Sequence, residues 1–314
     1  MIDFKSEKNK KVLMISLMVF FSIVFLVSSA ILINELVLKS VKQDQVTQKI
    51  QGVYDSGIQE KESMEDTFKK LQEINPDIKG WIYIPNTTVN YPVLEPQKND
   101  PSFYLYRDYE KNYTKYGSIF VDAKCGIKED TKNTIIHGHH MRDGKMFADI
   151  LKYGDIEFYK TSPVITFNTI YGPSEWKVIS VFKTNINSSQ GEIFDYLKVS
   201  FANDSSFLNY VHDVRQRSII NAPVDTKEDD QLLTLSTCSD EMEQFRTVVV
   251  ARKVRNGESN KVDVEKSCLN PAPLYPEAWY TKYGGTRPEE KSFEQALSDN
   301  EIYWYSKSED SQQN

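Results

Sequence analysis

The sequence predicts an all-β domain, either a barrel or a sandwich, with appended segments at both ends. About eight short segments rich in β-branched and aromatic residues are separated by turn-forming residues, while few segments show helical periodicity. The composition, 39% hydrophobic and 12% aromatic over 314 residues, supplies enough apolar side chains for one packed core. A net charge of −7 argues against a nucleic-acid-binding protein, which would carry a basic face.

An uncharged stretch near the amino terminus predicts a single membrane span. Residues 12–33 carry no charge over 22 positions, and a helix of that length crosses a hydrocarbon core of ~30 Å. Four lysines precede the stretch, at positions 5, 8, 10 and 11, whereas Asn34 and Glu35 follow it. The positive-inside rule therefore predicts a single-pass cell-membrane protein with residues 1–11 in the cytoplasm and the domain outside.

A cleaved signal peptide is the alternative interpretation of this stretch, because Ser28-Ser29-Ala30 offers small residues near a possible cut. The apolar run is longer than the roughly 7 to 15 residues of a signal-peptide core, which favours the anchor. Residues 34–60 are polar with scattered aliphatic residues. We interpret them as a helical or flexible stalk that lifts the domain off the membrane.

The first helix of the domain is predicted from one apolar stripe. Met64, Phe68, Leu71 and Ile74 follow one another at spacings of four, three and three, within residues 61–74. The helix should end before Pro76 and pack on the domain as an amino-terminal cap. We place the main domain at residues 61–254.

Strand-like segments fill most of the rest of this domain. The predicted strands are residues 80–85, 89–94, 117–122, 134–137, 164–170, 175–184, 232–235 and 245–251. Residues 146–153 are predicted to form a helical turn. A longer helix should begin at a cap on Ser205 or Ser206, with Phe207, Val211 and Val214 on its apolar face. It would cross over the sheet directly before the strand that ends in a cysteine.

Three chemically active side chains fall at predicted strand ends. Cys238 follows the apolar run 232–235, Arg246 lies at the start of the next strand, and His139 follows the strand 134–137. A thiol, an imidazole and a guanidinium so placed offer a nucleophile, a proton carrier and an oxyanion partner. Taken singly, each has an ordinary explanation, because most cysteines in apolar runs are small buried hydrophobes and most strand-edge arginines are solvated charges.

The residues around these three side chains resemble the signature of sortases, the bacterial cysteine transpeptidases. Thr234-Leu235-Ser236-Thr237-Cys238, an arginine on the next strand and the upstream Gly138-His139 carry the resemblance. Three further segments are similar to class B sortases: Tyr116-Gly117-Ser118-Ile119-Phe120-Val121-Asp122, Gly138-His139-His140-Met141 and Asp143-Gly144-Lys145-Met146-Phe147. The likeness spans roughly residues 71–254 and does not cover the last sixty residues.

The resemblance implies a closed sortase-type β-barrel with an amino-terminal helix, and a crossover helix beside the substrate groove. It assigns the nucleophile to Cys238 and the contact with a tetrahedral oxyanion or substrate carbonyl to Arg246. It also implies that Leu94, Ser236 and Thr237 lie by the groove. The segment from 61 to 254 would then be the catalytic domain.

Three histidines crowd one strand end, and the Gly-His step selects His139 as the general acid and base. Strand alternation would place His137 and His139 on one face and Gly138 and His140 on the other. We interpret His137 and His140 as local polar residues. This histidine would protonate the departing amine when the thioester forms and deprotonate the incoming amine when it is resolved.

The remaining polar residues near these motifs give weaker predictions. A metal site built from the histidines and Asp143 does not fit, because Asp143 is out of phase and no later ligand cluster follows, so we expect neither metal nor organic cofactor. Asp240 could orient His139 or hold Arg246, although an aspartate just after a strand end is usually solvated. His212, on the crossover helix, is predicted to be a solvated surface residue.

The resemblance implies a membrane-anchored transpeptidase. It would cleave a sorting signal of an exported protein through a thioester acyl-enzyme and transfer the product to an amine of a cell-wall precursor. Class B relatives commonly prefer a signal of the Asn-Pro-x-Thr-x type, but the sequence does not specify it. The alternatives are a pilin-polymerising sortase, a hydrolytic cysteine peptidase and a surface binding protein without catalytic activity.

Residues 255–314 differ in composition from the domain before them. They contain four prolines, at 271, 273, 276 and 288, several tyrosines and tryptophans, and few aliphatic residues. We interpret them as an extension of unknown role that packs on the barrel or on a partner. The three cysteines cannot all pair internally, and Cys125 and Cys268 are either a disulfide or incidental thiols.

Overall fold

The computed structural model describes residues 7–305, so the lysine at position 5 and the last nine residues of the predicted extension lie outside the described residues. The chain divides into two compact units, Met1–Ile50 and Gln51–Asn314. In the first unit, α1 (Glu7–Ile33) continues through the π-helical segment η1 (Asn34–Leu38) into α2 (Lys39–Gln59), whose residues 51–59 belong to the second unit. Within the described residues, one helix, Asn9–Gln59, is long and apolar enough to cross a membrane, by length and composition. The segment predicted to be a helical or flexible stalk is helical up to residue 59.

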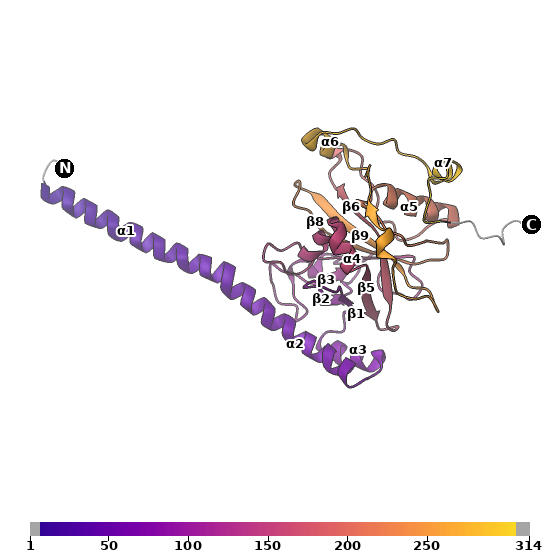
Figure 1. Cartoon of the computed structure of the whole chain (residues 1–314). Helices are drawn as coiled ribbons and strands as arrows, with labels where there is room; N and C mark the ends of the chain where they lie inside the picture. Colours follow the sequence, from indigo (N-terminus) through magenta and orange to yellow (C-terminus); the bar gives the residue numbers. More distant parts are fainter. Residues whose placement is uncertain (1–6, 306–314) are drawn as a thin grey trace, which may run out of the picture. The chain divides into compact units, whose positions relative to one another are not determined.

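Eight strands of the second unit close into a β-barrel (Figure 1). They are β1 (Ile78–Tyr83), β2 (Asn90–Leu94), β3 (Ile119–Val121), β4 (Asn133–His137), β5 (Val164–Thr169), β6 (Glu175–Asn185), β8 (Leu232–Cys238) and β9 (Phe245–Lys253), in the spatial order β1-β2-β3-β4-β8-β9-β6-β5. The predicted all-β class and strand number are confirmed. Of the two architectures that the residues left open, the barrel implied by the family resemblance is the one observed. The short strands β7 (Ile220–Asn221) and β10 (Cys268–Leu269) form a separate two-stranded sheet.

Side-chain alternation along the barrel strands separates two apolar cores. Leu233 and Leu235 of β8 pack inside the barrel, in one core with Val249 of β9. Leu232 and Val248 point to the outer face and pack with the side chains of the crossover helix. This period-two pattern is why a barrel strand that is buried on both faces reads as a continuous apolar run in the sequence.

The predicted helices form with adjusted boundaries. In the second unit α3 (Met64–Ile74) buries Phe68 and Leu71, and the predicted helical turn is the 3₁₀ segment η3 (Ala148–Gly154), followed by the short α4 (Ile156–Thr161). The crossover helix α5 (Asp204–Gln216) begins two or three residues earlier than predicted, because its cap is Asn203 rather than Ser205 or Ser206. The Asn203 side chain accepts from the Ser206 amide while the Ser206 hydroxyl accepts from the Asn203 amide, a reciprocal capping box.

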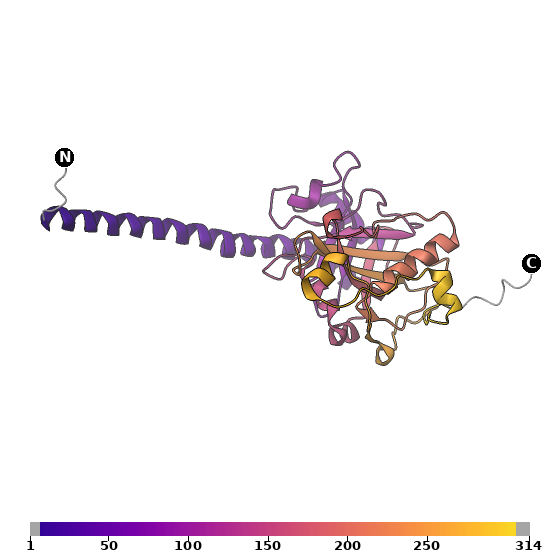
Figure 2. The ribbon, with the colours of Figure 1, turned by 90° about the horizontal axis from the view of Figure 1, so that it is seen from above.

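The described part of the extension, residues 255–305, packs against the barrel and α5. It contains η5 (Val264–Lys266), α6 (Glu277–Tyr283) and α7 (Phe293–Ser298), and Figure 2 shows α7 alongside α5. Phe293 and Trp304 are buried in the core beneath α5. The prediction that His212 is a solvated residue is wrong. The extension covers it, and its Nε2 lies 3.1 Å from the carbonyl oxygen of Lys291.

An ion-pair network fixes the start of the extension to the far end of β9. The buried Arg252 guanidinium contacts Asp225 and Glu258, while Arg255 donates to Asp225 and to Asp230. Burial alone would raise the pKa of Glu258, but hydrogen bonds from Arg252 and Lys177 hold that pKa well below its ordinary value. Each buried cation therefore has an anionic partner here.

Candidate active site

The pairing of β8 with β9 brings two of the three predicted site residues together. The antiparallel register sets Cys238 directly opposite Arg246, so both side chains lie on the same face of the sheet. Cys238 is exposed at the end of its strand, and Arg246 is half-buried. Two residues separated by a short loop in sequence thus become neighbours because the strands that carry them are hydrogen-bonded in register.

The third residue is held to the same strand end by its neighbour Gly138. The Gly138 amide donates to the carbonyl oxygen of Ser236 at 3.3 Å, and the Thr237 hydroxyl donates to the Gly138 carbonyl at 2.7 Å. A Cβ atom at position 138 would lie 2.5 Å from Ile119 Cδ1 and 2.7 Å from ring atoms of Phe147. The glycine of the Gly-His step is therefore required for close packing, and it places His139 beside the strand that ends in Cys238.

A backbone carbonyl orients the His139 ring. The Nε2 atom lies 2.7 Å from the carbonyl oxygen of Leu105, and since a carbonyl only accepts, Nε2 carries the proton. In the neutral ring, Nδ1 is then the free base. Burial lowers the pKa of His139 below its ordinary value, the hydrogen bond to Leu105 opposes this shift, and the positive charge of Arg246 adds to it. The imidazole is accordingly neutral at neutral pH.

The neighbouring histidines each pair with a different aspartate. His137 ends β4, and its Nε2 lies 3.0 Å from Asp122 Oδ2, so strand alternation does not extend to residue 139. His140 Nδ1 lies 3.2 Å from Asp240 Oδ1. Asp240 therefore contacts His140, rather than His139 or Arg246 as the sequence had suggested. In the described range 7–305, no three histidine, cysteine, aspartate or glutamate side chains are grouped as a metal site.

The three residues predicted to lie by the groove are buried. The Leu94 side chain has no exposed surface, and the Thr237 hydroxyl is used to hold Gly138. The Ser236 hydroxyl lies 3.0 Å from the hydroxyl of Tyr196, which arrives from the loop before α5. The side chains of Ser236 and Thr237 thus hold the strand end behind Cys238. Tyr196 was not predicted, because nothing in its polar sequence neighbourhood distinguishes it.

A buried lysine beneath the site was also missed by the sequence analysis. Lys183 of β6 is 5% exposed, and its Nζ lies 2.6 Å from Glu241 Oε1 and 2.9 Å from the Thr247 hydroxyl. Burial would raise the pKa of Glu241, but hydrogen bonds from Lys183 and Ser239 lower it. In the sequence, the one sign of this role is that Lys183 stands near the end of an apolar strand. This pair fixes the loop between Cys238 and Arg246 from below.

The extension holds the same loop from outside. The carbonyl oxygen of Glu241 accepts from the Tyr283 hydroxyl at 3.1 Å and from the Lys282 ammonium at 2.5 Å, both of α6. Gln190 adds a bond from its side-chain amide to the carbonyl oxygen of Glu243. The loop that joins the cysteine to the arginine is thus tied on two sides.

The cysteines are all free thiols in this structure. Cys125 is buried, where burial raises the pKa of its thiol to about 11, and Cys268 is exposed on β10. A disulfide between them, one of two possibilities left open by the sequence, does not form. Cys238 is the exposed thiol that the strand register sets opposite the Arg246 guanidinium.

Comparison with known proteins supports the same interpretation. A family model described as the sortase domain matches residues 82–254. Sortase B of Staphylococcus aureus is 34% identical over 196 residues, covering 62% of this chain and 77% of that protein. Sortase B of Listeria monocytogenes is 34% identical over 191 residues, covering 60% of this chain and 74% of that protein.

Solved structures agree with the sequence relatives. A Staphylococcus aureus sortase B–substrate complex superposes with a TM-score of 0.63 at 32% identity, covering 69% of this chain and 99% of that one. Sortase B of Bacillus anthracis in complex with AAEK1 gives a TM-score of 0.60 at 30% identity, with 69% and 99% covered. The resemblance predicted from the motifs is confirmed. The chain belongs to the sortase family of cysteine transpeptidases, and its relatives are class B enzymes.

Proposed function

We propose that this sortase uses Cys238 as nucleophile, His139 as general acid and base, and Arg246 as the donor to the oxyanion. The observation that carries the proposal is the strand register that sets Cys238 opposite Arg246, with His139 held to the same strand end through Gly138. A cysteine thiol with an ordinary pKa of ~8.5 is only a few per cent ionised at neutral pH, so a nearby cation favours the reactive thiolate.

The neutral His139 ring suits a proton relay through Nδ1. This atom takes the proton of the Cys238 thiol, and the Leu105 carbonyl stabilises the resulting imidazolium through the Nε2 proton. The sulfur attacks the substrate carbonyl, the C–S bond forms, and the C–N bond breaks as His139 protonates the departing amine. An incoming amine then attacks the thioester and loses its proton to the same nitrogen. The Arg246 fork donates to the oxyanion in both steps.

The proposed substrates are an exported protein that carries a sorting signal and an amine of a cell-wall precursor. The apolar helix would anchor the enzyme in the cell membrane with residues 1–11 in the cytoplasm and the catalytic domain outside, where both substrates meet. Carbonate extraction tests the anchor. The full chain should stay in the membrane pellet, and a chain lacking residues 1–33 should be released, whereas release of both would contradict the anchor.

Trapping the acyl-enzyme tests the reaction and reads out the sorting signal. The full chain is mixed with a library of sorting-signal peptides, and adducts are mapped by mass spectrometry. We expect a thioester on Cys238 that is absent in Cys238→Ala, and faster release with a ligated product when triglycine is added. Hydrolysis that triglycine leaves unchanged would indicate a peptidase, ligation to a lysine of another subunit would indicate pilin polymerisation, and no adduct with any peptide would indicate a binding protein.

A further inference from the structure

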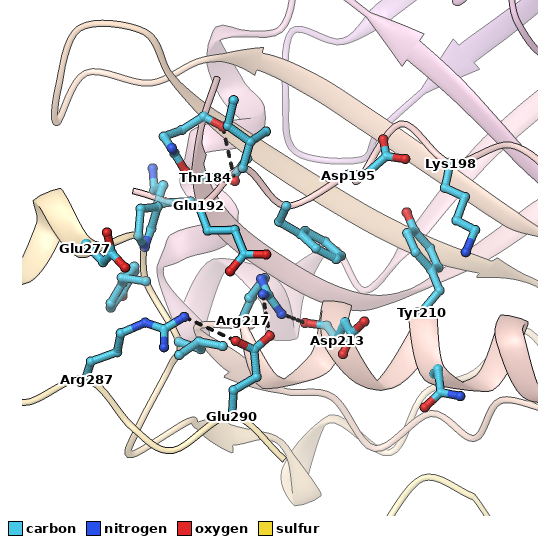
Figure 3. A pocket seen from close by; sticks show the side chains of 18 of the residues that line it. Thr184, Glu192, Asp195, Lys198, Tyr210, Asp213, Arg217, Glu277, Arg287 and Glu290 are labelled. Carbon is cyan, nitrogen blue, oxygen red and sulfur yellow. Dashed lines mark hydrogen bonds and ion pairs between the residues drawn. The ribbon is translucent and has the colours of Figure 1, made fainter. Parts of the chain in front are cut away.

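A pocket of about 550 Å³ lies next to the site but does not include its three residues (Figure 3). Its walls come from the end of β6, the loop 192–198, α5 and the extension. Figure 3 shows Arg287 and Glu290 of the extension on one side and Asp195 and Lys198 of the loop on the other. The extension supplies one wall, and it lies beyond the residues that the sortase family model matches.

The distance between this pocket and the nucleophile follows from the strand pairing. Thr184 lines the pocket and is paired with Arg246, which in turn is paired with Cys238. Paired residues share a face and have Cα atoms about 5 Å apart, so Thr184 lies about 10 Å from Cys238 on the same face. Tyr196 bridges the two places. Its hydroxyl contacts Ser236 in the site wall, while its neighbour Asp195 lines the pocket.

The unpaired charge of the pocket is mainly negative. On one wall the Glu290 carboxylate is shared by Arg217 at 2.7 Å and Arg287 at 3.2 Å, so this group leaves one positive charge in excess, against the four carboxylates and one lysine of the remaining lining. Four other lining carboxylates form no ion pair with any described residue: those of Glu192, Asp195, Asp213 and Glu277. The lining cation without an ion pair among the described residues is Lys198. Lys183, at the pocket end, is already paired with Glu241. The open part of the pocket therefore favours a cation.

We propose that this pocket binds a positively charged group of the amine acceptor, whose reacting amine lies at Cys238, about 10 Å from the pocket edge at Thr184. The inference rests on the proposed function and identifies the class of its second substrate. An amine must be uncharged to attack the thioester, so the cation in the pocket is a second group on the same molecule. The acceptor is accordingly a short peptide or amino-acid derivative with a reactive amine and a separate cationic side chain. Its reactive nitrogen forms the C–N bond as the C–S bond breaks, and its proton passes to His139.

Two acceptors that differ in one charge test this assignment. Glycyl-trimethyllysinamide carries a fixed cation that cannot act as a nucleophile, and glycyl-norleucinamide has a neutral side chain of similar length. The full chain, acylated with the peptide trapped above, should use the cationic acceptor with a kcat/KM about tenfold higher. This estimate assumes that each of the three partly exposed carboxylates raises the preference by about 1.5- to 5-fold. The preference should fall to about one in a variant that combines Glu192→Gln, Asp195→Asn and Asp213→Asn.

Hydroxylamine and a charge-matched variant are the controls. Hydroxylamine is uncharged at neutral pH and too small to reach the pocket, so it should resolve both acyl-enzymes at the same rate, which also shows that the variant is folded. A second variant removes three exposed carboxylates elsewhere, through Glu129→Gln, Asp229→Asn and Glu265→Gln. It should keep the tenfold preference.

The outcomes separate this inference from the proposed function. If the pocket variant keeps the preference, or if the charge-matched variant loses it equally, the pocket does not bind the acceptor. If the wild-type chain shows no preference between the two acceptors, the inference also fails while the transpeptidase function stands. If no acyl-enzyme forms on the wild-type chain, the proposed function itself is wrong.

Discussion

Two arginines on one face of β9 have opposite surroundings. Arg252, near the end of the strand, is fully buried and contacts Asp225 and Glu258. Arg246, near its start, is half-buried, and its hydrogen bond within the described residues goes to the backbone carbonyl of Phe245. A guanidinium paired with carboxylates stabilises the fold. A guanidinium without such a partner, beside an exposed thiol, has N–H donors available to bind a substrate. The difference predicts that one arginine controls stability and the other controls rate.

The largest expected effect is on stability, at the compensated end. Arg252→Met removes a fully buried cation from the network and leaves Glu258 with Lys177 and Asp225 with Arg255 as remaining partners, which should cost about 3 kcal/mol of unfolding free energy. Urea unfolding of the detergent-solubilised chain measures this cost. The rate of acyl-enzyme formation per folded molecule should stay near that of the wild type. A fall in that rate as large as the one expected for Arg246 would remove the contrast between the two arginines.

The second effect is on rate, at the uncompensated end. Arg246→Gln should lower the acylation rate by about 10²- to 10³-fold, because it removes a positively charged donor at the oxyanion position. Its unfolding free energy should change by less than about 1 kcal/mol, since no ion pair is lost. Single-turnover acylation and urea unfolding on the same samples measure both values. A variant that unfolds easily yet acylates normally would reverse the assignment.

The third effect tests whether the buried pair below the loop positions the site. Lys183→Met leaves Glu241 without its ammonium, so we expect a loss of about 2 kcal/mol in stability and a tenfold to hundredfold fall in kcat with little change in KM. Adding Glu241→Gln removes the unpaired charge and should restore most of the stability. Failure of the double variant to recover any stability would show that Lys183 acts through packing alone.

Lys183 also illustrates what the sequence could and could not reveal. The strand pattern predicted an all-β domain, because period-two alternation and turn residues are local properties. Cys238, His139 and Arg246 could be proposed because the family motif keeps them within short segments. The pairing of Lys183 with Glu241 joins β6 to the loop between β8 and β9. The burial of His212 depends on an extension that lacks any recognisable motif. Such contacts are set by tertiary packing, which one sequence does not display.

A fourth, smaller effect compares two carboxylates. Glu258 has cationic partners that lower its pKa, whereas burial of the unpaired Asp213 raises its pKa to about 6, despite the opposing charge of Arg217. Because the pKa of Asp213 is higher in the folded state, protonation of Asp213 stabilises the fold. This contribution to the folding stability is lost as the pH rises through about 6. Asp213→Asn should therefore stabilise the chain by roughly 1 to 2 kcal/mol at pH 7.5, after discounting for its partial exposure. The gain should vanish near pH 4, and urea unfolding at both pH values measures it.

The smallest effect concerns the imidazole of His139. Burial is the main cause that lowers the pKa of His139, and the charge of Arg246 adds to it. Arg246→Gln should therefore raise the pKa of His139, by less than the lowering that burial causes. The chain has four histidines, so an NMR titration assigned with His139→Gln can follow this ring directly. Arg255→Gln, which neutralises an arginine of the distant ion-pair network, should leave the titration unchanged. Because the His139 pKa is lowered, folding stability should fall as the pH drops below about 6.5. If both variants titrate like the wild type, His139 does not sense the charge on Arg246, and the two side chains do not act on one substrate carbonyl as a unit.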